Sequence, residues 1–391
     1  MPPAEDVAGA LHVLTLTPFF PSDQNEAFGC FVAEPIKELK QLGVESSVIA
    51  VSPIYHPRKH SSSSAAADWV RYPQVPGTFG LSSAGYLLYA RLLGRVRQLH
   101  SAKPIHVIHA HAALPCGHAA ALLSRRLNIP FVVTVHGLDV FNTCSLGGIP
   151  AARRRKVSVD VYRAARTVIC VSGRVQEILG TGIPGEIRST VVYNGVNPSL
   201  FSPTPSDAGK LAPEILVVGD LLPSKGHELV LRALGNLMPS FPQLRCRIVG
   251  EGPLRAQLDA LVRDLDIGRQ VRFVDRLSRS EVAEAMRRCS VFALPSQNEA
   301  LGCVYLEAMS CGKPVVACRG QGIDEVIEHG RNGWLIPADG LEELVQGLSV
   351  LLASPELCTR MGTAARQVIL EKLTLPHQAQ RLAAVYGQAI A

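Results

Sequence analysis

Short apolar runs that alternate with helical patterns constrain the fold of this 391-residue chain more than any other feature. In the second half, the predicted strands are residues 215–218, 246–249, 271–274, 291–294 and 314–317. Because they are largely apolar and alternate with helical segments, they indicate a parallel sheet that helices cover on both faces. Ligands bind such sheets at the carboxyl ends of the strands, so we expect a site in the loops there.

The first half carries a similar but weaker pattern. Its predicted strands lie at residues 11–16, 106–111, 131–135, 167–172 and 191–193, and residues 31–42 have the apolar spacing of a helix. A chain of this length is long enough for two domains of ordinary size. The fold class is therefore α/β.

Residues 295–309 place two acids around a helix that begins at glycine. Glu299 lies on the loop after the strand 291–294, and Glu307 lies on the helix that opens at Gly302. Backbone N–H groups at a helix start favour anions by roughly 0.3–1 kcal/mol per charge. We therefore expect a diphosphate near Gly302, Cys303 and Val304, with one carboxylate on each side for hydroxyl groups.

This segment resembles the E-x(7)-E signature of the nucleotide-sugar glycosyltransferases of the GT-B fold, specifically the retaining family four (glycosyl transferases group 1). Further matches follow the family's order along nearly the whole chain: Gly219, Lys225, Gly250, Gly320 to Gly322 and Asn332 to Ile336. The resemblance implies that Glu299 meets the sugar ring, that Glu307 meets the nucleotide ribose, and that Lys225 reaches a phosphate.

The resemblance also implies two Rossmann-like domains that face each other across a catalytic cleft. We place the acceptor-side domain at residues 1–201, a linker at 202–207 and the nucleotide-sugar-binding domain at 208–375, with a final helix at about 376–391 that packs back on the first domain. The implied activity is metal-independent, retaining transfer of a sugar from a UDP- or GDP-linked donor, without another cofactor. The implied acceptor is a glycan, a glycolipid or a small molecule, in the synthesis of a polysaccharide, a glycolipid or another glycoconjugate.

On the acceptor side, three residues match the family. Gly29 precedes a predicted helix, where a glycine lets backbone approach a ligand closely. His136 and Asp139 match the family's HG-x-D segment, which lines its cleft. The resemblance implies that His136 bonds a hydroxyl of the donor sugar, and that Asp139 orients His136 or the acceptor.

One position departs from the family pattern. The family usually has arginine directly after the glycine that ends the first strand of this half, whereas this chain has Asp220. Because arginine binds phosphate strongly, its loss lowers the affinity for the donor unless another cation such as Arg319 supplies the charge. An Asp220 side chain that points away from the ligand would leave the affinity unchanged.

Other classes of protein receive less support. His109 and His111 lie on one face of a predicted strand, but no carboxylate has matching spacing, so a structural role is favoured over a metal site. The pair Gly250 and Gly252 lacks the third glycine of a dinucleotide fingerprint. A nucleotide-sugar epimerase of the same fold and a catalytically silent binding or scaffold protein stay open, the latter because of Asp220.

Composition is consistent with these expectations. A hydrophobic content of 47% with 18% charged residues indicates sizeable cores, and the ten cysteines are scattered singly, as reduced thiols are. The first basic residue is Lys37 and no apolar run spans a bilayer, so we expect a cytoplasmic protein without a signal peptide.

The net charge of +6 is unevenly spread along the chain. Residues 86–97 interleave apolar residues with arginines at helical spacing, and 153–156 form a second basic cluster. The first segment fits an anionic membrane surface, at the inner face of the plasma membrane, but a core-facing helix with a solvated basic edge is favoured. No nucleic-acid-binding motif or aromatic platform accompanies the charge, so nucleic acid is not an expected partner.

Overall fold

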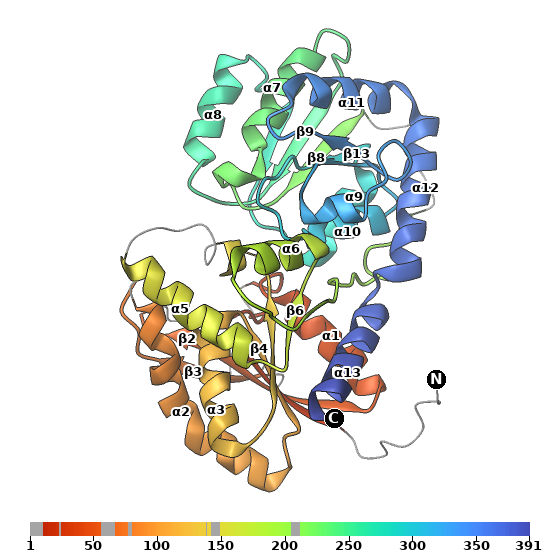
Figure 1. Cartoon of the computed structure of the whole chain (residues 1–391). Helices are drawn as coiled ribbons and strands as arrows, with labels where there is room; N and C mark the ends of the chain where they lie inside the picture. The colour runs from red at the N-terminus through yellow and green to blue at the C-terminus, as the bar shows by residue number, and fades with distance from the viewer. Residues whose placement is uncertain are drawn as a thin grey trace. The chain divides into compact units, whose positions relative to one another are not determined.

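The computed structural model describes residues 11–22, 25–55, 67–76, 80–137, 139–141, 149–204 and 212–391. The chain divides into two compact units: unit 1 is Met1–Tyr193 with Leu375–Ala391, and unit 2 is Asn194–Thr374 (Figure 1). These divisions fall at 193/194 and 374/375, where the sequence placed them at 201/202 and 375/376. Residues 205–207 of the expected linker lie outside the described residues.

Within the described ranges, the sheet of unit 1 has seven parallel strands in the order β3-β2-β1-β4-β5-β6-β7. Their bounds are Leu11–Thr17 (β1), Val44–Pro53 (β2), Asp68–Tyr72 (β3), Val107–His111 (β4), Phe131–Val135 (β5), Thr167–Cys170 (β6) and Ser189–Val191 (β7). The order reverses between β1 and β4, which are neighbours although two strands separate them in the sequence.

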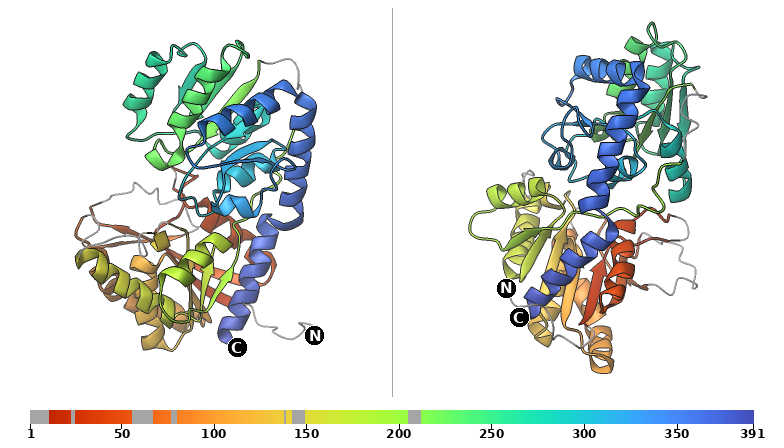
Figure 2. Two further views of the ribbon diagram at one scale, coloured as in Figure 1. Left: turned by 45° about the horizontal axis from the view of Figure 1, so that its top comes forward. Right: turned by 90° about the vertical axis from the view of Figure 1, so that its right-hand side faces the viewer.

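Helices cover both faces of this sheet, which explains why every residue of β4 and β5 is buried. One group comprises α1 (Cys30–Gln41) and α13 (Leu375–Ile390), which pack against each other. The other group comprises α2 (Leu81–Ala102), η1 (Ala113–Gly117), α3 (His118–Leu127) and α5 (Ile149–Ala164), and α6 (Gly173–Gly182) follows β6. Figure 2 shows the same elements in two further views.

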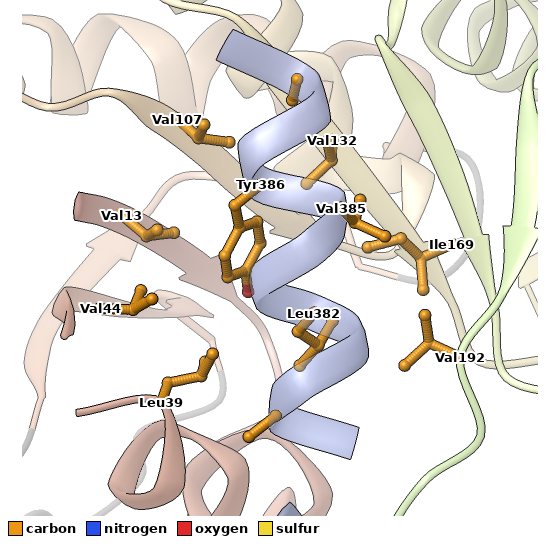
Figure 3. Close-up of a cluster of buried hydrophobic side chains, with 12 residues drawn as sticks. Val13, Leu39, Val44, Val107, Val132, Ile169, Val192, Leu382, Val385 and Tyr386 are labelled. Atoms are coloured by element: carbon orange, nitrogen blue, oxygen red, sulfur yellow. The ribbon is translucent and has the colours of Figure 1, made fainter. Parts of the chain in front are cut away.

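The last helix, α13, supplies part of the core of unit 1. Figure 3 shows Leu382, Val385 and Tyr386 of this helix facing Val13, Val107 and Val132 of the sheet. The Tyr386 side chain is 1% exposed, and its hydroxyl bonds His109 Nδ1 at 2.7 Å. Full burial of a large apolar side chain contributes roughly 1.5–3 kcal/mol. Unit 1 therefore depends on residues from both ends of the chain.

In the described part of unit 2, the sheet has six strands, all parallel, in the order β10-β9-β8-β11-β12-β13. The strands are Glu214–Val218 (β8), Arg245–Val249 (β9), Val271–Val274 (β10), Val291–Ala293 (β11), Val315–Cys318 (β12) and Trp334–Ile336 (β13). The order reverses between β8 and β11.

The helices of unit 2 form two groups by their contacts. One comprises α7 (His227–Leu237), α8 (Arg255–Asp264) and α11 (Leu341–Ala353), and the other α9 (Arg279–Arg288), α10 (Cys303–Ser310) and α12 (Pro355–Lys372). The consecutive helices α11 and α12 also contact each other and join the two groups. Short segments η2 (Pro223–Lys225) and η3 (Gly322–Glu325) lie in loops after β8 and β12. Both units are thus doubly wound α/β folds, as the alternation of apolar runs predicted.

The basic segment at residues 86–97 lies in α2. Leu88, Leu92 and Val96 are fully buried, while Arg91 and Arg95 are exposed and Arg95 pairs with Asp68. The helix therefore faces the core with a solvated basic edge, and membrane binding stays a prediction. None of the helices that the structure describes has the length and apolar character needed to cross a membrane.

The cysteines that the structure describes are free thiols, and most of them are buried. Burial raises the pKa of the Cys170 and Cys246 thiols to about 12. At neutral pH these thiols are therefore protonated and unreactive.

Candidate active site

In unit 2, the loops after β8 and β11 lie side by side at the carboxyl ends of the two strands where the strand order reverses. The backbone N–H of Gln297 donates to the carbonyl of Ser224 at 2.7 Å, and Ser296 Oγ donates to the same carbonyl at 3.2 Å. In open α/β sheets this reversal point is where ligands bind. The topology therefore points to these loops as a binding site.

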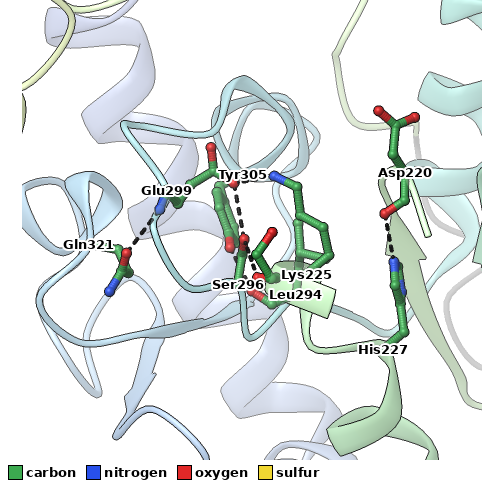
Figure 4. A network of polar contacts seen from close by, with 9 residues as sticks. Asp220, Lys225, His227, Leu294, Ser296, Glu299, Tyr305 and Gln321 are labelled. Carbon is green, nitrogen blue, oxygen red and sulfur yellow. Dashed lines mark hydrogen bonds and ion pairs between the residues drawn. The ribbon is translucent and has the colours of Figure 1, made fainter. Parts of the chain in front are cut away.

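Lys225 and Glu299 meet in these loops (Figure 4). Lys225 Nζ lies 2.5 Å from Glu299 Oε2, and Ser296 Oγ donates to the same oxygen at 3.1 Å. The backbone N–H of Glu299 bonds Gln321 Oε1 at 2.9 Å. The side chains of Lys225 and Glu299 are 26% and 14% exposed, so the pair is fixed yet reachable from solvent.

Gly302 opens α10 in a conformation that favours glycine. Its φ is 78°, and a Cβ built there would lie 2.5 Å from the Tyr305 ring, whose hydroxyl donates to the Leu294 carbonyl at 2.6 Å. The first turn of α10, which Cys303 and Val304 begin, has N–H groups that the helix itself does not bond. Glycine therefore allows the positive end of the helix dipole to start directly at the loop that carries Glu299.

Glu307 lies inside α10 in a largely buried ion pair. Its Oε1 accepts a hydrogen bond from Arg279 Nη1 at 2.9 Å, and the two side chains are 11% and 12% exposed. The Arg279 guanidinium also lies 5.1 Å from the centre of the Phe201 ring. Sequence analysis selected Glu307 but not Arg279, the cation that holds it.

Asp220 also binds a cation that the sequence analysis missed. Arg276 Nη2 lies 3.3 Å from Asp220 Oδ1, and the two side chains are 40% and 59% exposed. The Asp220 carbonyl bonds His227 Nε2 at 3.0 Å, at the start of α7 (Figure 4). A guanidinium therefore lies beside the position where the family has its arginine, and it comes from the loop after β10.

Gly219 and Gly250 lie where β8 and β9 end. The N–H of Gly219 bonds the Val249 carbonyl and that of Gly250 bonds the Val274 carbonyl, each at 3.0 Å. These bonds continue the hydrogen-bond pattern between neighbouring strands into the loops. Both glycines therefore belong to the same edge of the sheet as Lys225 and Glu299.

In unit 1, a second group of polar side chains lies where the strand order reverses between β1 and β4. His111 ends β4, and its Nδ1 lies 3.0 Å from Nε2 of His136, which follows β5. The two rings are stacked, with centroids 5.2 Å apart. Phe19 and Phe31 flank the His136 ring at 5.5 and 4.8 Å.

Asp139 fixes the loop that carries His136. Its Oδ1 accepts hydrogen bonds from the backbone N–H groups of His136, Gly137 and Val140 at 3.0–3.1 Å. Burial raises the pKa of the Asp139 carboxyl to about 6, although these N–H donors act to lower it. The structure thus shows Asp139 orienting the backbone of the His136 loop.

Gly29 lies at the start of α1 with a φ of 79°. A Cβ there would lie 2.4 Å from the backbone carbon of Phe19. Any side chain would therefore displace the segment that carries Phe19, one of the two rings beside His136.

The histidines of unit 1 bond one another and nearby hydroxyls. His109 Nε2 lies 2.7 Å from Thr134 Oγ1, and His109 Nδ1 lies 2.7 Å from the Tyr386 hydroxyl. Burial lowers the pKa of His109 and of His136 to about 3, so both rings are neutral at pH 7. Among the described residues, no cluster of three or more His, Cys, Asp or Glu side chains has the arrangement of a metal site.

The predicted site residues therefore form two groups, one in each unit. Gly29, His136 and Asp139 lie in unit 1. Unit 2 contains the other predicted residues, namely Gly219, Lys225, Gly250, Glu299, Gly302, Cys303, Val304 and Glu307. His111 was expected to have a structural role, and Ser296 and Gln321 lie inside the motif segments but were not singled out. The partners that sequence analysis did not assign to the site, because they come from separate parts of the chain, are Phe19, Phe31, Arg276 and Arg279.

Two doubly wound units of this kind define the GT-B class of glycosyltransferases. Two family models match the chain: Glycosyltransferase Family 4 at residues 31–200 and Glycosyl transferases group 1 at residues 205–368. Together the two matches cover most of both units. The chain belongs to the family 4 (group 1) glycosyltransferases of the GT-B fold, as the E-x(7)-E resemblance predicted.

Curated relatives are glycosyltransferases. An uncharacterised glycosyltransferase of Methanocaldococcus jannaschii is 29% identical over 295 residues, which cover 75% of this chain and 78% of the relative. The D-inositol 3-phosphate glycosyltransferase of Streptomyces bingchenggensis is 28% identical, over 73% of this chain and 67% of its own. The GDP-mannose-dependent alpha-(1-6)-phosphatidylinositol monomannoside mannosyltransferase of Mycolicibacterium smegmatis is 27% identical, over 74% and 78%.

Solved structures show the same fold at lower identity. Sucrose-phosphate synthase of Thermosynechococcus elongatus has a TM-score of 0.77 and 19% identity, and the match covers 97% of this chain and 98% of that one. The Anabaena protein HepE, in complex with UDP and glucose, has a TM-score of 0.75 and 22% identity, with 96% and 99% covered.

Proposed function

We propose that this glycosyltransferase moves a sugar from a UDP- or GDP-linked donor to an acceptor hydroxyl, with retention of configuration and without a metal ion. The observation that carries the proposal is the Lys225–Glu299 pair beside the start of α10, at the reversal point of the unit 2 sheet. HepE, which shares the fold, binds UDP and UDP-glucose, and the mannosyltransferase relative is named for GDP-mannose. Both support a nucleoside diphosphate as the donor's leaving group.

Lys225 is suited to contact the donor and Glu299 together. An ammonium group has three N–H donors, and one of them bonds Glu299 at 2.5 Å. The others are available to a phosphate oxygen. The first turn of α10 adds further stabilisation of an anion beside this ion pair.

In the proposed reaction, the bond between the anomeric carbon and the phosphate oxygen breaks while the acceptor oxygen bonds the same carbon on the same face. The departing phosphate oxygen takes the proton of the acceptor hydroxyl. Negative charge develops on the diphosphate as it leaves, and Lys225 with the amides of α10 stabilises that charge where it forms. Glu299 holds the sugar and is not a nucleophile.

The remaining predicted residues have binding roles in this proposal. Glu307 bonds the nucleotide ribose, and His136 bonds a hydroxyl of the donor sugar. The acceptor is a glycan, a glycolipid or a small molecule with a free hydroxyl. The inositol phosphate and phosphatidylinositol mannoside acceptors named for relatives support this range of acceptors.

Two substitutions test the proposal. Lys225→Ala and Glu299→Ala should each lower turnover by about 10²–10³-fold, because each removes a preorganised group at the reacting centre. The matched control is Glu228→Ala, which removes an exposed ion pair with Arg232 in the same unit. Turnover is measured as transfer from UDP- and GDP-sugars to added acceptors, and the anomeric configuration of the product is read by NMR.

The same assay separates the alternatives. Wild-type turnover in both variants would remove the roles assigned to Lys225 and Glu299. Recovery of an isomerised donor without an acceptor would identify an epimerase. A donor that stays intact with every acceptor and in water would indicate a binding or scaffold protein.

A further inference from the structure

Three imidazoles lie next to one another in unit 1, on β4 and directly after β5. The rings of His109 and His111 have centroids 4.3 Å apart, and His111 bonds His136 through Nδ1 and Nε2 at 3.0 Å. His109 and His111 are 2% and 6% exposed. Burial of a polar group is costly unless the group is hydrogen-bonded. The ring nitrogens of these histidines therefore need hydrogen-bond partners within unit 1.

The two nitrogens of His109 are both used. Its Nδ1 bonds the Tyr386 hydroxyl and its Nε2 bonds Thr134 Oγ1, each at 2.7 Å. His109 is therefore held by α13 on one side and β5 on the other. Its ring forms a fixed surface against which His111 packs.

His136 has one nitrogen committed and one available. Its Nε2 is bonded by His111, and in the part of the chain that the structure describes no group bonds its Nδ1. Phe19 and Phe31 contact its ring, so the plane of the imidazole is restricted. The direction in which Nδ1 points is thus set by His111 and by two aromatic rings.

We propose that His111 is a positioning residue that holds the His136 ring through Nε2, so that His136 Nδ1 is presented to a hydroxyl group of the donor sugar. This inference rests on the proposed function, because it takes the ligand of His136 to be a sugar. Two neutral imidazoles that share one hydrogen bond place a single proton between them, so the tautomer of His111 decides whether His136 Nδ1 donates or accepts. His111 therefore controls both the direction and the hydrogen-bonding sense of His136.

The experiment compares His111→Leu with His111→Asn. Asparagine has a polar atom near the position of Nδ1 and can either donate or accept, whereas leucine can do neither. His111→Leu should lower kcat by about 10- to 100-fold, since a small misplacement of a substrate-positioning group has effects of this size. His111→Asn should recover most of that loss. The affinity for UDP or GDP should stay unchanged in both variants, because the proposed nucleotide-binding residues lie in unit 2.

Two controls separate positioning from folding. His12→Leu removes another buried imidazole of the same sheet, which bonds Ser47 and the Pro104 carbonyl and has no bond to His136. It should lower stability without the loss in kcat. In a His136→Ala background, His111→Leu should cause no further loss, because its effect acts through His136.

The outcomes are decisive in each direction. Equal losses for His111→Leu in the wild-type and His136→Ala backgrounds, or no recovery in His111→Asn, would overturn the inference while leaving the proposed function intact. A wild-type protein that transfers no sugar to any acceptor would refute the proposed function itself. Rescue by asparagine together with the absence of an additive loss would establish the positioning role.

Discussion

At the scale of single residues, the acids that mark the site in unit 2 are each paired with a cation. Glu299 pairs with Lys225, Glu307 with Arg279 and Asp220 with Arg276. Sequence analysis selected the three acids and Lys225, since these lie in motifs. Arg276 and Arg279 were not predictable, because they are 56 and 28 residues from their partners and meet them only once the strands are ordered.

These ion pairs differ in burial and therefore in their contribution to stability. Exposed pairs such as Asp220–Arg276 are worth about 0–1 kcal/mol, so Arg276 can leave Asp220 at little cost. We therefore propose Arg276, besides Arg319, as a candidate for the cation that replaces the family's arginine. The Glu307–Arg279 pair is largely buried, and breaking such a pair has a larger effect.

Replacement of Glu307 should therefore destabilise unit 2. Glu307→Ala should lower its free energy of unfolding by about 3–5 kcal/mol, because Arg279 loses its carboxylate partner in a buried position. Glu307→Gln, which keeps a hydrogen-bond acceptor, should cost less. The measurement is denaturant unfolding followed by the fluorescence of Trp334 in a Trp69→Phe background, since each unit contains one of the chain's two tryptophans.

The control for this prediction is Glu328→Ala, which breaks an exposed pair with Arg331 in the same unit. Its effect should stay within about 0.5 kcal/mol. If Glu307→Ala were as mild as the control, the buried pair would not support the unit, and a loss of activity in that variant could be assigned to nucleotide binding alone.

At the scale of elements, the start of α10 is the feature that the sequence predicted best. The apolar strand, the glycine and the acids on either side are local in sequence, so pattern and spacing were sufficient to place them. Less was predictable where structure depends on distant contacts. The strands β2 and β3 were not named, and β3 has only half-buried residues apart from Tyr72 and one exposed arginine, so it lacks the apolar run that marks the others.

A substitution at Gly302 tests the role of the helix start. Gly302→Ala should lower UDP or GDP affinity at least about tenfold, because the new Cβ would lie 2.5 Å from the Tyr305 ring and displace the first turn of α10. Gly330→Ala is the matched control, since Gly330 has a similar φ of 80° and open space around its Cβ position.

Both substitutions place alanine in a left-handed conformation, at a cost of about 1–2 kcal/mol. Calorimetric titration with each nucleoside diphosphate and unfolding of unit 2 separate that shared strain from the effect on binding. Loss of affinity in Gly330→Ala as well, or unchanged affinity in Gly302→Ala, would contradict the assigned role.

At the scale of the whole molecule, the two units share one topological feature. Each unit has a parallel sheet whose strand order reverses once, and in each unit the candidate residues lie at that reversal. The order of the motifs predicted both folds and most candidate residues. The first division between the units was less predictable: it lies at 193/194 and not at 201/202, because only packing shows to which unit the residues after β7 belong, whereas the return of the last helix to unit 1 was expected.

The buried histidines give unit 1 a defined pH dependence. The pKa of His109 falls to about 3 and that of His111 lies well below its ordinary value, because burial disfavours the charged ring. The folded unit therefore binds fewer protons than the unfolded chain, so this stability is present above about pH 6.5 and is lost as the pH falls. At pH 5 His109 should have lowered the free energy of unfolding of unit 1 by about 2 kcal/mol, and His111 acts in the same direction.

Asp139 acts in the opposite direction. Its raised pKa of about 6 favours folding at low pH, and this contribution disappears as the pH rises through 6, so it offsets part of the histidine effect between about pH 4 and 6. Unfolding of unit 1, followed by Trp69 in a Trp334→Phe background, should show a net loss of stability from pH 7.5 to 5. The loss should be smaller in His109→Gln, and an equal loss in both proteins would contradict the assignment.

The central claim is that a nucleoside diphosphate binds unit 2 beside Lys225. Calorimetric titration of the wild-type protein and Lys225→Ala with UDP, GDP, uridine and guanosine tests it most directly. We predict that one of the two diphosphates binds the wild-type protein and that Lys225→Ala weakens it by about 10- to 100-fold, the value of a charged hydrogen bond, without changing nucleoside binding. Binding of neither diphosphate, or equal affinity in the two proteins, would contradict the account.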